Sequence, residues 1–200
     1  MKSHALKFGL AAAATLALVA CNNNGSGNKS ETAQSPAAQK AAGNKTIASG
    51  LNASGKFMAA TKAAGLDQTL AGPGPYTVFV PDDAAMDAAP AGTFDAKPEN
   101  RGQLTGIITN VILPGTVMAA DIGKAIDAGK GKAVLATMGG GTLTATRDGD
   151  KIVLTDSAGH KATVTQADDQ FSNGVVHHVD AVLMPAKGAA AKPAVGQKAG

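Results

Sequence analysis

The sequence predicts one mixed α/β domain of the α+β class, with helices first along the chain and strands later. Apolar residues in the first half recur three or four positions apart, which is the spacing of a helix face. From Ala133 onward they alternate with polar residues, which is the period of a strand. A valine-rich stretch between Asn173-Gly174 and Pro185 then predicts a last strand that runs through the middle of the domain.

Composition and charge restrict the classes of function. The 200 residues are 44% hydrophobic but only 3% aromatic, with no Trp, so the interior must be aliphatic and few rings are left for stacking on sugars or bases. The formal net charge is +3, yet residues 44–185 contain eleven basic and fourteen acidic side chains. We therefore expect no nucleic-acid partner.

The first 20 residues are typical of a lipoprotein signal peptide. Lys2 and Lys7 precede an apolar run that begins at Phe8 and ends at Ala20, and this run is too short to span a membrane. Residues 18–21, Leu-Val-Ala-Cys, resemble the bacterial lipobox, in which the Cys thiol is acylated and the chain is cut before it. Cys21 is thus the expected lipid attachment site; the alternative is an ordinary signal peptide followed by a stray Cys.

The chain divides into four parts on this interpretation. After the signal peptide (residues 1–20), residues 21–43 form a flexible tether without periodicity, and residues 44–185 form the domain. Residues 186–200, rich in Ala and Lys, are a disordered tail. Asn rather than Asp after Cys21 favours export to the outer membrane, on its periplasmic or surface face.

Helices are expected where apolar spacing and capping signals agree. Phe57, Ala60, Thr61 and Ala64 would face the core from a helix that Gly65 ends. The predicted helical segments are 56–64, 66–70, 84–88, 98–110 and 119–126.

Strands are expected at residues 76–81 and, after a short extended segment at 111–113, in a meander. Glycine-rich turns separate the members of that meander, which makes each neighbouring pair antiparallel. The predicted strands of the meander are 133–138, 142–147, 151–155 and 161–165, followed by the last strand at 175–183.

Two sets of polar residues invite a chemical interpretation. His177 lies on the apolar side of the last strand, where it is either a buried neutral ring bonded to backbone or a metal ligand or general base; we favour the first, because no convergent partner is visible. His178 and Asp180 are read as a surface pair on the other side. Asp82 and Asp83 are interpreted as caps of the helix that follows them rather than as acid–base or metal residues.

Three blocks of the sequence, in order, resemble the fasciclin domain family: residues 74–86, 97–115 and 172–185. The resemblance covers about 46–185. Asn110-Val111 stand where the family usually carries Tyr-His, a pair tied to receptor adhesion in some animal members, so that activity is not carried over. The residues matched to the family's structural motifs are Thr77, Phe79, Pro81, Asp82, Pro114, Gly115, Asn173, Gly174, His177 and Asp180.

The resemblance implies a fasciclin-like β wedge of mostly antiparallel strands with several short helices packed on one side. It also implies an extracellular or surface interaction domain without catalytic activity. We therefore expect a cell-envelope lipoprotein that serves cell adhesion or matrix association, with the membrane and an unknown protein or glycan as partners. The alternative is a periplasmic or surface protein that binds a small apolar molecule or glycan in a groove between helices and sheet.

An enzyme is the third reading and the least favoured. The only thiol is taken up by the predicted acylation, and the sequence contains no Ser elbow, metal-spaced His cluster or cofactor loop. No catalytic residue, cofactor or metal is expected.

Overall fold

A computed structural model describes residues 44–51 and 55–185. The predictions for residues 1–20, 21–43 and 186–200, including lipidated Cys21, lie outside the described residues. The helices are α1 (Ile47–Gly50), α2 (Lys56–Ala64), α3 (Asp67–Ala71), α4 (Asp83–Asp87), the 3₁₀ turn η2 (Pro98–Asn100), α5 (Arg101–Asn110) and α6 (Ala119–Ala128). The strands are β1 (Tyr76–Pro81), β2 (Ile112–Pro114), β3 (Ala133–Ala136), β4 (Thr142–Asp148), β5 (Lys151–Thr155), β6 (Lys161–Phe171) and β7 (Gly174–Val179).

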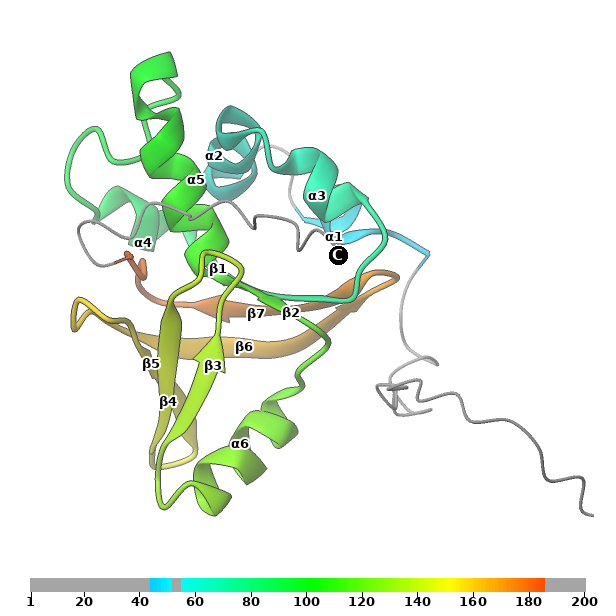
Figure 1. The fold of residues 1–200 in the computed structure, drawn as a ribbon, viewed down its shortest axis with the longest axis vertical. Helices are drawn as coiled ribbons and strands as arrows, with labels where there is room; N and C mark the ends of the chain where they lie inside the picture. The colour runs from blue at the N-terminus through cyan, green and yellow to red at the C-terminus, as the bar shows by residue number, and fades with distance from the viewer. Residues whose placement is uncertain (1–43, 52–54, 186–200) are drawn as a thin grey trace, which may run out of the picture. The chain divides into compact units, whose positions relative to one another are not determined.

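One seven-stranded sheet organises the domain, in the order β2-β1-β7-β6-β5-β4-β3 (Figure 1). β3 to β6 form the expected antiparallel meander, whereas β1 runs parallel to β7. β7 therefore lies inside the sheet, between β1 and β6, as predicted. The mixed α+β class and the wedge of mostly antiparallel strands are confirmed.

The helices divide between two regions of the sheet. α1 to α5 gather on one side of β1 and β7, while α6 packs separately against β3 and β4 (Figure 1). The predicted core face of α2 is confirmed, because Phe57, Ala60, Thr61 and Ala64 are all buried. Met58 is buried as well, since α2 packs between α3, α4 and α5 rather than on one flat surface.

The last strand is shorter than predicted, ending at Val179 rather than Leu183. Asp180 explains the end, because its carboxylate Oδ1 accepts the N–H of Thr163 at 2.6 Å and its own N–H donates to the Thr163 carbonyl. The Asp180 carboxylate thus accepts a hydrogen bond that a backbone carbonyl would otherwise accept in the ladder between β6 and β7. The chain then leaves the sheet, and the Met184 N–H donates to Asp156 Oδ2 at 2.7 Å.

β6 is longer than predicted, extending to Phe171 rather than residue 165. Its register against β7 shifts twice, between Val164 and Gln166 and again between Gln166 and Asp169. Asp168 lies in the second irregular part with φ 63°, a left-handed conformation that costs energy for any residue but Gly. The polar sequence of this part hides the strand, since the bulges break the alternation that strand prediction depends on.

Asn173 and Gly174, predicted as a turn, also join three distant segments. The Asn173 side chain accepts the Ile47 N–H at 2.8 Å and donates to the carbonyls of Leu70 and Gly72 at 2.8 and 2.9 Å. A Cβ on Gly174 would lie 2.0 Å from the carbonyl oxygen of Tyr76, so only Gly permits this approach of β7 to β1. The pair therefore fixes α1, α3 and β1 around the start of β7.

Replacing Asn173 by Ala is expected to lower the free energy of unfolding by about 3 kcal/mol, because buried backbone groups of α1 and α3 lose their partners. Urea unfolding followed by circular dichroism measures the change. Asn100→Ala is the matched control, since the Asn100 amide lies 3.4 Å from its two carbonyl partners and makes only weak bonds. Equal effects of the two substitutions would contradict the role given to Asn173.

Candidate functional site

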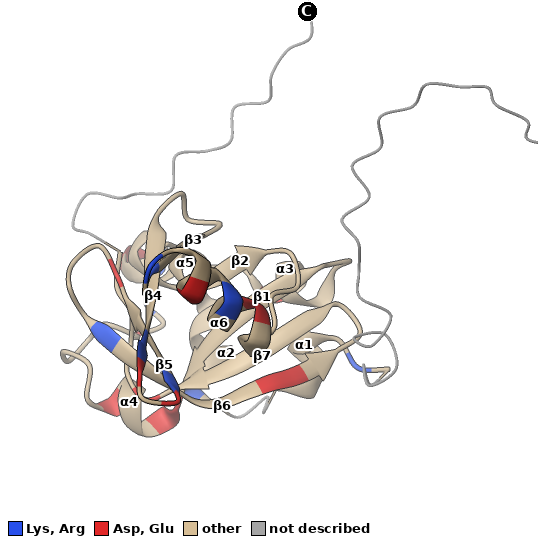
Figure 2. Ribbon diagram, turned by 90° about the horizontal axis from the view of Figure 1, so that it is seen from below, with Lys and Arg blue, Asp and Glu red and all other residues tan. Residues whose placement is uncertain are grey.

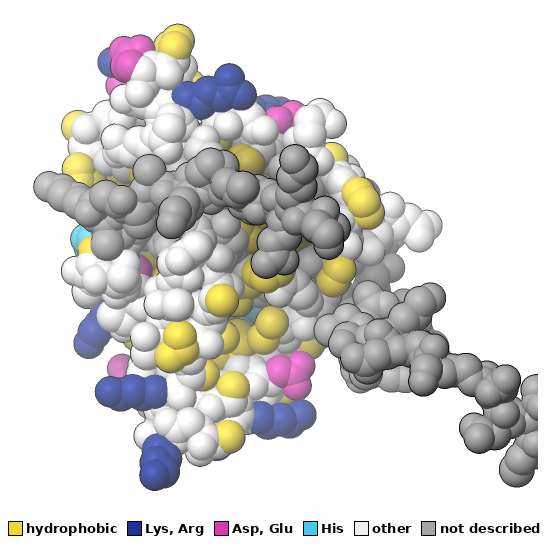
Figure 3. Space-filling model, viewed as in Figure 1, with side chains coloured by type: hydrophobic (Ala, Val, Ile, Leu, Met, Phe, Trp, Pro, Cys, Tyr) yellow, Lys and Arg dark blue, Asp and Glu magenta, His cyan; other side chains and the backbone are white. Residues whose placement is uncertain are grey.

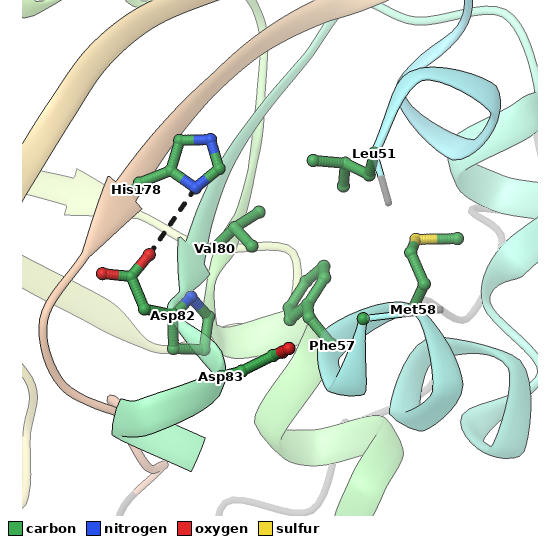
Figure 4. Close-up of a pocket in the computed structure, with 9 residues that line it drawn as sticks. Leu51, Phe57, Met58, Val80, Asp82, Asp83 and His178 are labelled. Atoms are coloured by element: carbon green, nitrogen blue, oxygen red, sulfur yellow. Dashed lines mark ion pairs between the residues drawn. The ribbon is translucent and has the colours of Figure 1, made fainter. Parts of the chain in front are cut away.

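A cavity of about 200 Å³ opens between α2 and the strands β1 and β7 (Figure 4). It is smaller than the cavities that hold drug-sized ligands. The lining comes from the end of α1, the start of α2, the end of β1, the start of α4 and one position of β7. The lining residues are Leu51, Gly55, Phe57, Met58, Val80, Pro81, Asp82, Asp83 and His178.

One wall of this cavity is apolar. Phe57 and Met58 from α2 and Val80 from β1 are 3–6% exposed, and Leu51 closes the wall at the end of α1 (Figure 4). These side chains are held rigidly because each also packs into the core of the domain. The wall thus offers a preformed aliphatic and aromatic surface.

The opposite rim is polar. His178 Nδ1 lies 3.9 Å from Asp82 Oδ1, with the two side chains 25% and 48% exposed (Figure 4). The predicted surface pair of His178 with Asp180 is therefore wrong: Asp180 bonds to Thr163, and the neighbour of His178 is Asp82. This pairing follows from the parallel register, which places β7 beside β1 so that His178 stands opposite Val80, near the strand end from which Asp82 projects.

The prediction that Asp82 and Asp83 cap the following helix is confirmed only in position, since Asp82 is the N-cap residue of α4 and Asp83 lies in its first turn. Asp82 holds the N-cap position of α4 but makes no side-chain capping bond. Asp83 Oδ1 instead accepts the N–H of Lys56, the first residue of α2, at 3.0 Å. Gly55 at the N-cap of α2 has no side chain to do this, so a carboxylate from another helix supplies the acceptor. An ion pair between Lys56 and Asp87 holds the same two helices together.

His177 lies on the closed side of the sheet and is fully buried. Its Nε2 is 2.9 Å from the carbonyl oxygen of Val117, and its Nδ1 accepts the N–H of Asp168 at 3.2 Å. The ring stacks on Phe79 with the centroids 5.3 Å apart. Burial lowers the pKa of His177, and the two backbone partners place the single proton on Nε2. Both ring nitrogens are thus engaged, which leaves none for a metal or a substrate proton.

Thr77 completes the same network. Its Oγ1 donates to the Gly115 carbonyl at 2.8 Å and accepts the Val117 N–H at 2.9 Å. Gly115 turns the chain with φ 96°, directly after Pro114 ends β2. Asp168 Oδ1 accepts the N–H of Ala119, at the start of α6, at 2.8 Å. The connection from β2 to α6 is therefore fixed by the centre of the sheet.

The residues matched to the family's structural motifs fall into three groups in space. Thr77, Phe79, Pro114, Gly115 and His177 share the network just described, and Asn173, Gly174 and Asp180 fasten the two ends of β7. Only Pro81 and Asp82 line the cavity.

Sequence reasoning missed two further parts of the structure. The aliphatic half of the cavity was one, because helical spacing marks residues as buried without showing which of them border a void. The other was Asp168, for which the only sequence signal is a polar tract between two strands.

The position where the family usually carries Tyr-His is covered in this chain. Asn110 and Val111 are each 3% exposed. The turn after β3 lies over them: the Gly139 N–H donates to the Thr109 carbonyl at 3.0 Å, and the Met138 N–H donates to the Ile112 carbonyl at 2.8 Å.

Two features are absent from residues 44–51 and 55–185. No cluster of three His, Cys, Asp or Glu side chains there has the geometry of a metal site. No helix there has the length and hydrophobicity that a membrane span requires.

The lowered pKa of His177 predicts a pH-dependent stability. The unfolded chain binds a proton on this ring below the ordinary pKa of 6.5, whereas the folded protein resists doing so. The contribution of His177 to the free energy of unfolding should therefore have its full value above pH 6.5 and decrease as the pH drops below 6.5. His177→Phe keeps an aromatic ring at this position but cannot bind a proton there. The unfolding free energy of this variant should therefore vary less between about pH 5 and 7. If the unfolding free energies of the two proteins, each measured by chemical denaturation, changed equally with pH, this prediction would be contradicted.

Comparison with known proteins places the chain among relatives. The family model for the fasciclin domain matches residues 53–185. The chain is 37% identical over 147 residues to protein sll1483 of Synechocystis, covering 72% of this chain and 71% of that protein. It is 29% identical over 165 residues to the cell surface glycolipoprotein MPB83 of Mycobacterium bovis, covering 82% of this chain and 67% of that one.

Two further matches are to parts of larger proteins. The chain is 32% identical over 127 residues to the pig transforming growth factor-beta-induced protein ig-h3, covering 64% of this chain but only 17% of that protein. A solved FAS1 domain pair from the insect cell adhesion molecule fasciclin I matches with a TM-score of 0.51 and 21% identity, over 64% of this chain and 44% of that one, and shares the fold. Since the family model matches more than half of its residues, this chain belongs to the fasciclin domain family.

Proposed function

We propose that this chain is a cell-envelope lipoprotein that presents one non-enzymatic fasciclin domain for adhesion or matrix association. The observation that carries the proposal is the match to a cell surface glycolipoprotein, which extends over 165 residues and is thus longer than the domain itself. The solved FAS1 domain pair that shares the fold comes from a protein named a cell adhesion molecule.

The sequence before the domain supports display at a membrane. Cys21 after Leu18-Val19-Ala20 would carry acyl chains, and two or three such chains anchor a protein stably where one does not. Residues 22–43 would then separate the domain from the bilayer. The membrane is one partner on this proposal, and a protein or glycan on the facing surface is the other.

The described domain is better suited to binding another molecule than to catalysing a reaction. Its most enclosed imidazole, His177, has both nitrogens bonded to backbone. Basic and acidic residues are interspersed on the side seen in Figure 2, around α6, β4 and β6, so no strip of one sign dominates that side. A surface of mixed charge with a small excess of acidic residues favours protein or glycan contacts over binding to polyanions.

The anchor and the attachment are tested together. Cells that produce the wild-type chain should attach to surfaces better than a deletion strain, and Cys21→Ser should reduce attachment to the deletion level. In detergent phase partitioning, the wild-type chain should enter the detergent phase and Cys21→Ser should stay aqueous. Aqueous behaviour of both chains would refute the anchor. Unchanged attachment in the deletion strain would refute the role in adhesion.

The cavity between α2 and β7 favours a second candidate function, the binding of a small apolar molecule. The wall of Phe57, Met58 and Val80 would hold an aliphatic group, and the rim of Asp82 and His178 would bind a polar end. The modest volume limits this ligand to a short chain with one hydrogen-bonding head group.

Thermal unfolding with short-chain aliphatic alcohols, amines and sugars tests this candidate. A ligand at about ten times its Kd should stabilise the folded chain by about 1.4 kcal/mol and raise Tm by roughly 3–5 °C. Leu51→Trp, which fills the mouth of the cavity, should abolish the shift, whereas Val153→Thr on the remote strand β5 should not. No shift with any compound, or a shift that survives Leu51→Trp, would rule out ligand binding in this cavity.

A further inference from the structure

A second cavity, of about 320 Å³, lies between α2, the end of α4 and the loop that joins α4 to η2. Its volume falls within the range of roughly 300–1,000 Å³ that is usual for small-molecule sites. The lining is formed by residues 56, 59 and 60 of α2, residues 86 and 87 of α4 and residues 89–96 of the loop. None of these residues lines the cavity between α2 and β7, so the two cavities are separate sites.

The loop on one side of this second cavity is fixed by its own hydrogen bonds. Thr93 is buried and donates both its N–H and its hydroxyl to the Pro90 carbonyl, at 3.1 and 2.6 Å. The Asp95 N–H donates to the Gly92 carbonyl at 3.3 Å, and Gly92 has φ 83°, a conformation that Gly adopts without strain. Phe94, between them, packs against the core. The shape of this side is therefore set before any ligand binds.

The apolar part of the lining consists mostly of small side chains. Ala59 and Ala60 follow Lys56 by three and four positions, so all three share one face of α2. Ala60 and Met86 are buried, whereas Ala59 is exposed. Because alanine is short, α2 leaves space there that a larger residue would fill. Phe94 adds one of the few aromatic rings of the chain.

The polar part of the lining carries both signs of charge. Lys56 forms an ion pair with Asp87, and Lys97 Nζ, just beyond the lining, lies 3.0 Å from Asp95 Oδ2. Figure 3 shows side chains of both signs at the end of the domain where α5 begins, close to this loop. A carboxylate that forms one ion pair still has lone pairs for further hydrogen bonds. Asp87 and Asp95 are thus held in place and can still accept from a ligand.

We propose that this cavity binds one neutral pyranose ring of a glycan. The C–H groups of the sugar would lie against Phe94 and the alanines, while its hydroxyls would donate to Asp87 and Asp95. A hydrocarbon would displace water from these carboxylates without replacing its hydrogen bonds, which costs free energy. A charged ligand would be repelled as well as attracted, because two ammonium groups accompany the two carboxylates. Neutral hydroxyls on an apolar body match both parts of the lining.

This site deepens the proposed function by giving the glycan partner a place on the domain. Any contribution of the site to attachment rests on that function, whereas binding of a free sugar needs neither the anchor nor a surface. One ring held by a few hydrogen bonds gives weak affinity, and several anchored copies facing one glycan surface would strengthen the attachment.

Nuclear magnetic resonance titration of the full chain carrying Cys21→Ser, which removes the acyl anchor, tests the site. The probes are the methyl pyranosides of glucose, galactose, mannose and N-acetylglucosamine. At least one should bind with a Kd of about 1 mM and shift the amide signals of Gly92, Thr93 and Asp95. Absence of a saturable shift with all four sugars up to about 100 mM overturns the proposal.

Three variants locate the binding. Ala59→Leu places a larger side chain in the cavity from an exposed helix position, so it should retain the circular dichroism of the parent and raise the Kd at least about tenfold. Ala120→Leu makes the same change at an exposed position of α6 and should leave the Kd unchanged. Asp95→Asn keeps the shape but removes the charge of one acceptor, and should raise the Kd about fivefold. Equal Kd values for Ala59→Leu and the parent overturn the proposal.

Further outcomes separate this site from its alternatives. Cyclohexanol that binds here as tightly as the sugars, or glucuronate or glucosamine that binds more tightly, overturns the assignment to a neutral sugar. Loss of sugar binding in Leu51→Trp would place the sugar in the cavity between α2 and β7 and overturns it too. Cell attachment is scored separately: sugar binding without attachment refutes the proposed function alone, and attachment without sugar binding refutes this inference alone.

Discussion

The parallel pairing of β1 with β7 is the contact on which the rest of the domain depends. The two strands are about a hundred residues apart in the chain, and parallel strands cannot be joined by a tight turn, so everything between them must cross from one end of the sheet to the other. The crossing contains α4, α5 and α6 and the whole meander. Asn173 and Gly174 set the start of the pair, and Asp82, whose N–H donates to the Val179 carbonyl, marks its end.

Closing the sheet around this pair determines where polar groups are buried. His177 points to the covered face of the sheet, whereas His178 points to the other face, so His177 cannot reach water and must find its partners inside. It finds them in two irregular segments, the connection before α6 and the strained bulge at Asp168. The left-handed conformation of Asp168 is offset by what it allows, since its N–H reaches the imidazole and its carboxylate reaches the start of α6. Strain here serves assembly of the fold rather than chemistry.

The same arrangement positions the cavity beside α2. The cavity beside α2 exists because helices packed at the carboxyl end of β1 leave a gap over Val80 that no side chain fills. The cavity uses only two of the residues matched to the family's motifs, Pro81 and Asp82, because most of those residues maintain the sheet.

The order of elements, the buried face of α2, the meander and the interior place of the last strand were determined by the sequence, because spacing and turn residues act locally. Tertiary structure alone decided the partners of polar side chains. Asp83 binds the start of α2 and Asp180 replaces a ladder bond, since each meets a backbone group that is distant along the chain or lies on another strand. Strand ends and bulges were likewise decided by neighbours, as in β6 and β7, because the alternation of side chains carries no information about where pairing stops.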